Sequence, residues 1–170
     1  FAVGRTQEIL YHLSVLYHAG RLRQQMVFLD SPMAIKVTEL YHRARKALDP
    51  EDLKVLNRVA SGDTGRYLPV LRMTRTVEAS MAINRIHGGA IIIAGAGMCN
   101  GGRIIHHFRY NLERPDTRLV IVGFQAAGTV GRQIVDGAER IRVLGRDLAV
   151  KAKVHTLGGF SAHAGQTQLL

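Results

Sequence analysis

The residue best suited to catalysis in this 170-residue chain is a histidine near its end. His163 closes a turn, residues 158–163, whose small side chains would let a ligand approach the imidazole closely. A group whose pKa lies near 7 can donate or accept a proton, or hydrogen-bond a phosphate, at neutral pH. Ser161 would contribute a hydroxyl beside it. The alternative is a histidine that only caps the following helix.

Three glycine-containing loops, residues 95–102, 123–132 and 158–163, each follow a segment that the sequence predicts to be a strand. A glycine loop between a buried strand and a helix brings bare N–H groups and a helix N-terminus together, which suits phosphate oxygens. Arg5 and Ser31 would lie along the same edge. For each of these residues, turn geometry alone is the competing explanation. The phosphate ligands predicted in the first two loops are Gly97, Met98, Gly101, Gly102, Gln125, Gly128, Thr129, Gly131 and Arg132.

The balance of charged residues favours a polyanionic partner. The chain carries 23 Lys and Arg against 13 Asp and Glu, a formal net charge of +10, and 18 of the basic residues are arginine. Residues 1–85 and 86–170 each contribute +5, so the whole chain is basic. Arginine favours planar, bidentate phosphate contacts, and binding of this kind weakens steeply with salt. The alternative is that the charge serves solubility only.

Cysteine and histidine usage offers no metal site. Cys99 is a single cysteine, so it cannot form an internal disulfide, which fits a cytoplasmic protein; we expect a small loop residue. His106 and His107 are adjacent, so on a helix they lie on different faces and make a poor metal site. One is expected to pack, and the other to meet solvent or a phosphate. No apolar run approaches the ~20 residues needed to cross a bilayer, so no membrane partner is expected.

Strand and helix patterns alternate along the chain. Thr6, Ser31 and Thr76 are predicted helix caps, and Gly20 is a predicted helix stop. The predicted strands are residues 1–3, 26–29, 70–73, 90–94 and 119–122, and those at 26–29, 90–94 and 119–122 are expected to be buried. The predicted helices are residues 6–20, 32–46 (Pro32 to Lys46), one that begins at Pro50, and 76–86, while residues 61–67 are the least structured internal stretch. Residues 140–143 and 149–154 alternate polar and apolar around Gly145, which predicts an antiparallel hairpin.

This order predicts an α/β fold: a mostly parallel, Rossmann-like sheet with helices on both faces and a C-terminal antiparallel hairpin. We expect a single domain over residues 1–170. The carboxyl ends of parallel strands meet at one edge, where ligands bind. The three glycine loops are therefore predicted to gather there.

Three blocks of the sequence resemble the β-CASP domain of RNA- and DNA-processing nucleases in the metallo-β-lactamase superfamily. This family includes bacterial and archaeal ribonucleases and the endonuclease subunit of the cleavage and polyadenylation specificity factor. The blocks are Gly97-Met98 with Gly101-Gly102 and His106; Gly123-Phe124-Gln125 with Gly128-Thr129 and Gly131-Arg132; and Ser161-Ala162-His163-Ala164. Residues 1–8 and 28–34 fit the same family. Ala96 departs from it, since a serine is common there, so only backbone contact to a phosphate is expected at that position.

The resemblance implies that His163 is the family's motif B histidine, placed at a dinuclear zinc site. Its implied role is to donate a proton to the leaving oxygen or to steady the scissile phosphate. The two zinc ions would be held by a metallo-β-lactamase domain of the same chain, whose His-x-His-x-Asp-His motif does not occur here. We therefore expect an excised insert that binds RNA, in single-stranded form, holds no zinc itself and does not cleave RNA alone.

Two other functions stay open. A Rossmann-type nucleotide-binding domain would share the fold, but no Gly-x-Gly-x-x-Gly opens a first βαβ unit here. A non-catalytic, scaffolding β-CASP subunit would share the sequence blocks, and His163 argues against it. Nothing in the sequence specifies an oligomeric state.

Overall fold

The computed structural model describes residues 2–43 and 68–158. The chain divides into two compact units, Phe1–Gly95 and Ala96–Leu170, and each is described by itself. The predicted helix at Pro50, the segment 61–67, Ser161 and His163 lie outside the described residues.

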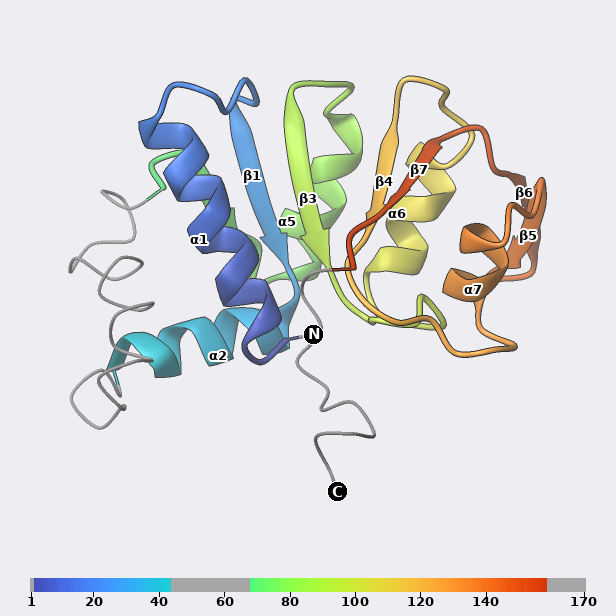
Figure 1. The fold of residues 1–170 in the computed structure, drawn as a ribbon, viewed down its shortest axis with the longest axis horizontal. Helices are drawn as coiled ribbons and strands as arrows, with labels where there is room; N and C mark the ends of the chain where they lie inside the picture. Colours follow the sequence, from blue (N-terminus) through green and yellow to red (C-terminus); the bar gives the residue numbers. More distant parts are fainter. Residues whose placement is uncertain (1, 44–67, 159–170) are drawn as a thin grey trace. The chain divides into compact units, whose positions relative to one another are not determined.

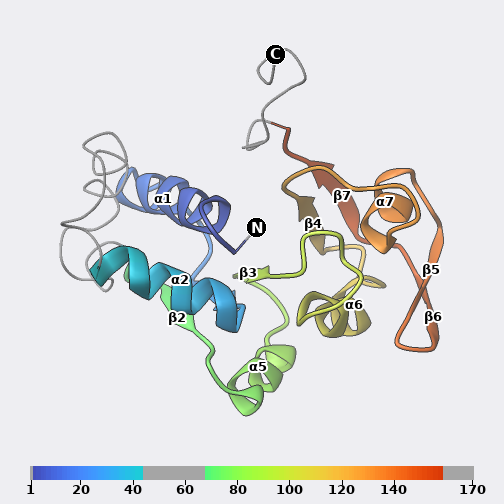
Figure 2. The ribbon, with the colours of Figure 1, turned by 90° about the horizontal axis from the view of Figure 1, so that it is seen from below.

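The first unit is built on a three-stranded parallel sheet in the order β2-β1-β3 (Figure 1). In the sheet register, Phe28 lies opposite Arg72 on one side and Ile92 on the other. The helices α1 and α5 lie on opposite sides of this sheet (Figure 2), so the predicted α/β fold is confirmed. In chain order the elements are α1 (Arg5–His18), β1 (Met26–Asp30), α2 (Pro32–Arg43), β2 (Leu71–Met73), α5 (Val77–Ala82), the 3-10 helix η2 (Ile83–Arg85) and β3 (Ala90–Ala94).

Two predicted helix caps of this unit are confirmed. The Ser31 hydroxyl accepts a hydrogen bond from the Ala34 N–H at 3.4 Å, and α2 begins at the intervening Pro32. The Thr76 hydroxyl accepts from the Ala79 N–H at 3.1 Å. Each hydroxyl satisfies one of the N–H groups that have no partner inside the first helical turn.

The predicted start of the first helix is wrong. The helix α1 begins at Arg5 behind Gly4, no side chain caps it, and Thr6 is a fully buried residue inside it. Ala2 and Val3 form a turn rather than the predicted strand end. The predicted stop is confirmed, because α1 ends at His18 and Gly20 follows with φ +66° and an N–H bonded to the Tyr17 carbonyl.

The core of the first unit lies between its sheet and its helices. Leu10 of α1 and Ile35 of α2 pack with Leu29 at the centre of β1, and each is at most 2% exposed. The remaining buried members of this cluster are Val27, Ala34, Leu68 and Ile93.

The second unit contains one parallel and one antiparallel strand pair. The strand β4 pairs in parallel with β7, and β5 pairs with β6 in an antiparallel hairpin. The elements are α6 (Ile104–Asn111), β4 (Arg118–Ile121), α7 (Val130–Val135), β5 (Arg140–Val143), β6 (Arg146–Ala149) and β7 (Lys153–Thr156). No helix within the described ranges is long and apolar enough to cross a membrane.

The hairpin was predicted correctly, but its second arm was not. The arm is β6, residues 146–149, whereas most of the predicted arm belongs to β7 and the residues before it. The reason is the turn: Leu144 and Gly145 have φ values of +50° and +74°. Two successive residues with positive φ make the tight two-residue turn that fits the twist of a hairpin. The arms must therefore begin on either side of these two residues.

The strand β4 is only half buried, whereas the sequence predicted a buried strand. Ile121 is 6% exposed, but Val120 is 45% exposed. Successive side chains of a strand point to opposite faces of the sheet, so only one face of β4 packs on the core.

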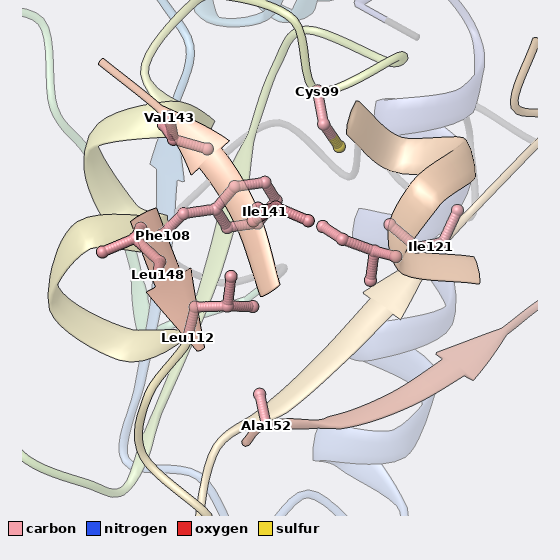
Figure 3. Close-up of a cluster of buried hydrophobic side chains, with 9 residues drawn as sticks. Cys99, Phe108, Leu112, Ile121, Ile141, Val143, Leu148 and Ala152 are labelled. Atoms are coloured by element: carbon pink, nitrogen blue, oxygen red, sulfur yellow. The ribbon is translucent and has the colours of Figure 1, made fainter. Parts of the chain in front are cut away.

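The core of the second unit is formed by α6, α7, β4 and the hairpin. Phe108 of α6 and Leu112, which directly follows α6, point towards Ile141 and Leu148 of the hairpin (Figure 3). Cys99 belongs to the same cluster, with 4% of its surface exposed, and burial raises the pKa of its thiol to about 11. The cysteine is thus a packed loop residue, as predicted.

Candidate functional site

Two of the predicted phosphate-binding loops, residues 96–102 and 123–132, lie against each other in the second unit. Four hydrogen bonds join them: Gln125 Nε2 to Gly97 O (2.8 Å), Val130 N to Asn100 Oδ1 (2.8 Å), Gly131 N to Met98 O (3.1 Å) and Ala126 N to Met98 Sδ (3.3 Å). The structure thus confirms that these two loops meet. The third loop lies largely outside the described residues.

Gln125 is the centre of this junction. Its side chain is 6% exposed, and its amide nitrogen also approaches the carbonyls of Phe124 (3.0 Å) and Gly123 (3.4 Å). Three surrounding carbonyls fix which end of the amide is the nitrogen. The amide oxygen is buried and accepts no hydrogen bond from the described residues. Gln125 therefore cross-links the two loops, and its part in phosphate binding stays a prediction.

Gly131 packs directly against this amide. A Cβ at position 131 would lie 1.8 Å from Gln125 Oε1 and 3.2 Å from the backbone oxygen of Met98. The first separation is shorter than any atomic contact, and the second is tighter than most, so the close approach of α7 to the loops favours glycine here.

The N-terminus of α7 has no bare N–H groups, so that part of the prediction is wrong. The first three amides of α7 donate to Asn100 Oδ1, to the Met98 carbonyl and, at 3.2 Å, to the hydroxyl of Thr129. That hydroxyl is the helix cap, and it donates in turn to Ala126 O at 2.7 Å. The amides of Ala127 and Gly128, two exposed residues directly before the cap, donate no hydrogen bond within the described residues, so a phosphate contact there stays a prediction.

Open backbone donors lie instead at the start of α6. No hydrogen bond among residues 2–43 and 68–158 uses the N–H groups of Gly101, Gly102, Ile104 or Ile105. No side chain caps α6, which begins directly after Arg103. A helix N-terminus carries partial positive charge, so an anion is stabilised beside these groups. The N–H groups of Gly101 and Gly102 are open, and phosphate contact at these residues stays a prediction.

Arg132 is exposed but is held by its own helix. Its Nε and Nη2 atoms each lie 2.8 Å from a carboxylate oxygen of Asp136, one turn further along α7. Hydrogen bonding to Asp136 raises the pKa of the Arg132 guanidinium above its ordinary value. A phosphate at Arg132 would have to share or displace this carboxylate.

The first unit contributes Ser31 and Arg5. Ser31 is half-buried directly after β1, and its Oγ would lie 3.5 Å from a Cβ built on Gly95, which follows β3. These two residues meet because β1 and β3 are neighbouring parallel strands that end at the same edge. Arg5 is the half-buried first residue of α1.

A buried carboxylate beside Ser31 was not predicted. Asp30 is fully buried at the end of β1, and its two oxygens accept hydrogen bonds from the hydroxyls of Thr74 and Ser80, the latter at 2.7 Å. These bonds tie β1 to the segment after β2 and to α5. An acidic residue at the end of an apolar strand was the sequence signal that could have revealed it. Burying a carboxylate without hydrogen-bond donors is costly, so such a residue indicates that donors lie nearby.

The paired histidines behave as predicted, since His107 is 5% exposed and His106 is exposed. In the part of the chain that the structure describes, no group of three or more His, Cys, Asp or Glu side chains could hold a metal ion. These residues therefore do not fit a zinc site. His163 and Ser161 fall outside this part, so their roles stay predictions.

Residues 6–134 match the family model described as the Beta-Casp domain. The chain belongs to the β-CASP family. The match contains Ser31 and all nine ligands predicted in the first two glycine loops. Residues 147–170, which contain Ser161 and His163, match a second model, described as a Zn-dependent metallo-hydrolase RNA specificity domain.

Relatives of this β-CASP chain carry names that refer to RNA or transcription. Ribonuclease TTHA0252 of Thermus thermophilus is 43% identical over 171 residues, covering all of this chain and 38% of the relative. The transcription termination factor FttA of Methanosarcina mazei is 30% identical over 175 residues, covering all of this chain and 27% of the relative. The RNase J-like protein of Methanocaldococcus jannaschii is 30% identical over 170 residues, covering all of this chain and 37% of the relative. The chain thus spans less than two fifths of the length of each.

Proposed function

We propose that this β-CASP chain binds the RNA substrate of a metal-dependent ribonuclease and presents it to a catalytic domain elsewhere in the full-length protein. The observation that supports this most is the succession of matches to a β-CASP domain and to an RNA specificity domain within one chain. The ribonuclease, RNase J-like and termination-factor names of its relatives agree with an RNA substrate. We place this activity in the cytoplasm.

The RNA is proposed to be single-stranded and to be held through its phosphates. In the second unit, the open N–H groups of Gly101 and Gly102 and the exposed guanidinium of Arg132 supply the donors. In the first unit, the Ser31 hydroxyl and Arg5 supply others. The net charge of +10 adds long-range attraction for a polyanion. A single strand can follow an irregular loop surface better than a rigid duplex can.

Cleavage is proposed to need groups outside the described residues. Because those residues do not fit a zinc site, the two zinc ions are assigned to a metallo-β-lactamase domain of the same protein. His163 is proposed to hydrogen-bond the scissile phosphate or to protonate the leaving oxygen. On its own, the 170-residue chain should bind RNA and leave it intact.

Fluorescence anisotropy with a labelled single-stranded RNA across a salt series tests the binding proposal. We expect measurable binding at low salt, with log K falling linearly against log salt by about 0.7 for each phosphate neutralised. A double-stranded RNA of the same sequence serves as the control and should bind more weakly. Affinity that is flat in salt, or no binding at low ionic strength, would contradict a phosphate-binding surface.

A cleavage assay of the same chain with added zinc separates binding from catalysis. We expect intact RNA after incubation, and no stoichiometric zinc by atomic absorption. Tight zinc binding by this chain would show that its own residues form the metal site. RNA binding without cleavage by the full-length protein would favour a scaffolding subunit instead.

A further inference from the structure

We propose that Phe124 is a base-stacking residue, which lays its ring against a nucleobase of the bound single-stranded RNA. With 68% of its surface exposed, Phe124 is the most exposed large hydrophobic side chain among the described residues. Water contact with an aromatic ring is unfavourable, so a ring presented this openly has a cost that binding a flat apolar partner removes. The inference rests on the proposed RNA-binding function.

The backbone of Phe124 is held in place while its ring is free. Its carbonyl accepts a hydrogen bond from the buried Gln125 amide at 3.0 Å, and the preceding carbonyl, of Gly123, lies 3.4 Å from the same nitrogen. Two residues further on, the Ala126 N–H donates to Met98 Sδ. A ring fixed on a rigid loop loses little conformational freedom on binding, which preserves affinity.

The surroundings of the ring fit a base better than a protein partner. Gln125 is buried, and the other neighbours in the loop are Gly123, Ala126, Ala127 and Gly128, none of which reaches beyond Cβ. Protein interfaces need several apolar side chains that pack together. A single ring flanked by small residues instead lets a flat base and the RNA backbone approach closely.

The half of the chain that contains this loop is basic, which suits the phosphates that accompany a base. Residues 86–170 carry ten Lys and Arg against five Asp and Glu. Arg132 follows the loop in the first turn of α7, and Gly101 and Gly102, with unused N–H groups, belong to the loop that is bonded to it. Stacking platforms beside basic grooves are the usual means of binding single strands without reading their sequence.

Substitution of Phe124 gives the first test, in anisotropy titrations of the 170-residue chain. We expect Phe124→Ala to weaken binding of a single-stranded oligouridylate by about five- to 150-fold, and Phe124→Tyr to retain it. The salt slope should not change, because stacking neutralises no phosphate. An abasic oligonucleotide of the same length keeps the phosphates and lacks the bases, so it should bind the parent chain and Phe124→Ala equally.

Tryptophan fluorescence gives the second test, because the chain contains no tryptophan. The single tryptophan of Phe124→Trp should be quenched by the oligouridylate and not by the abasic strand. Tyr110→Trp is the matched control, since Tyr110 is an aromatic residue 51% exposed on α6, and its emission should not respond. Both tryptophan variants should unfold at the same urea concentration as the parent chain.

The outcomes distinguish this inference from the proposed function. If neither RNA nor the abasic strand binds the parent chain, the RNA-binding function itself fails. If RNA binds the parent chain and Phe124→Ala equally, or if both tryptophans respond alike, base stacking fails and RNA binding stands. If Phe124→Ala leaves RNA affinity unchanged but abolishes a dimer in sedimentation, the ring belongs to a protein interface and the inference is overturned.

Discussion

At position 131 the space for a side chain is already taken by the Gln125 amide. Gly131→Ala would place a methyl group 1.8 Å from Gln125 Oε1, so the two loops must separate or Gln125 must leave its site. We expect a loss of about 1–3 kcal/mol in the free energy of unfolding, the usual range for overpacking. Urea unfolding followed by circular dichroism measures it.

Gly101→Ala is the matched control for this substitution. No atom lies within 4 Å of a Cβ at position 101, so stability should be nearly unchanged. In the Gly131→Ala chain, adding Gln125→Ala should restore part of the lost stability because it removes the clashing amide. Equal stability of Gly131→Ala and the parent chain would show that the junction is not close-packed.

Ionisation of Cys99 should make the free energy of unfolding depend on pH only above about pH 9. Its pKa is raised by burial from an ordinary value of 9.0 to about 11 in the folded chain. Below pH 9 the thiol is protonated in both folded and unfolded chains, so it contributes no pH dependence. Between pH 9 and 11 the unfolded chain loses the proton more readily, so stability falls by up to about 1.4 kcal/mol per pH unit.

The measurement for Cys99 is urea unfolding of the parent chain and of Cys99→Ala between pH 8 and 10.5. The difference between the two should be constant to pH 9 and should then shift in favour of Cys99→Ala. Iodoacetamide should also modify the folded chain far more slowly than the urea-unfolded chain, because the thiolate is the reactive form. A folded thiol as reactive as the unfolded one would contradict the burial of Cys99.

At the scale of elements, the helix α7 restrains a residue that is proposed to bind RNA. Asp136 holds the Arg132 guanidinium one turn away, so Asp136→Asn should free it for a phosphate. We expect RNA affinity to rise about twofold to fivefold at low salt, and Arg132→Ala to cancel the gain. Anisotropy titrations of the single and double variants measure this coupling.

Asp147→Asn is the control for Asp136→Asn, since it makes the same change in net charge on the hairpin. Asp147 is exposed on β6, and none of the predicted ligands lies on that strand. Its effect on affinity should be smaller. An equal effect would mean that RNA responds to overall charge, and not to the release of Arg132.

The elements whose starts depend on local chemistry were predictable from the sequence. Ser31 and Thr76 each stand where a hydroxyl can accept an N–H of the next helical turn, and each does so. Thr6 has the same chemistry, yet it is buried inside α1. Packing buried Thr6 inside the helix instead. The residue type at one position does not show whether its hydroxyl will cap a helix or be buried in one.

The sequence predicted that two of the glycine loops meet, but not the hydrogen bonds that join them. The glycine loops in the sequence predicted that Gly97, Met98 and Gly131 lie close together, and in the structure they do. The sequence could not show that the first three N–H groups of α7 donate hydrogen bonds to Asn100, Met98 and Thr129. The bonds to Asn100 and Met98 join residues about 30 positions apart, and only the folded chain brings such residues together.

At the scale of the whole molecule, His163 and Arg132 should affect different steps of the proposed reaction. In the full-length protein, His163→Ala should lower the single-turnover cleavage rate by ~10²–10⁴-fold while RNA binding survives, because a proton donor acts on charge that develops during cleavage. Arg132→Ala should mainly weaken binding, because the phosphate it contacts is charged throughout.

Single-turnover rates and dissociation constants for both variants, measured at one salt concentration, separate these effects. The unsubstituted full-length protein is the reference. Cleavage by His163→Ala at the parent rate would remove the motif B assignment, and the turn at 158–163 would then serve only to connect segments.

The parallel pairing of β4 with β7 has a consequence for synthesis on the ribosome. Residues 118–121 find their partners only at residues 153–156, after α7 and the whole β5–β6 hairpin have been made. The hairpin needs only neighbouring residues, so it can form while the chain is still emerging, whereas β4 must wait for β7, its strand partner in the described residues. A translational pause before residue 156 leaves the exit tunnel would therefore prolong the interval in which β4 is open to pairing with another nascent chain.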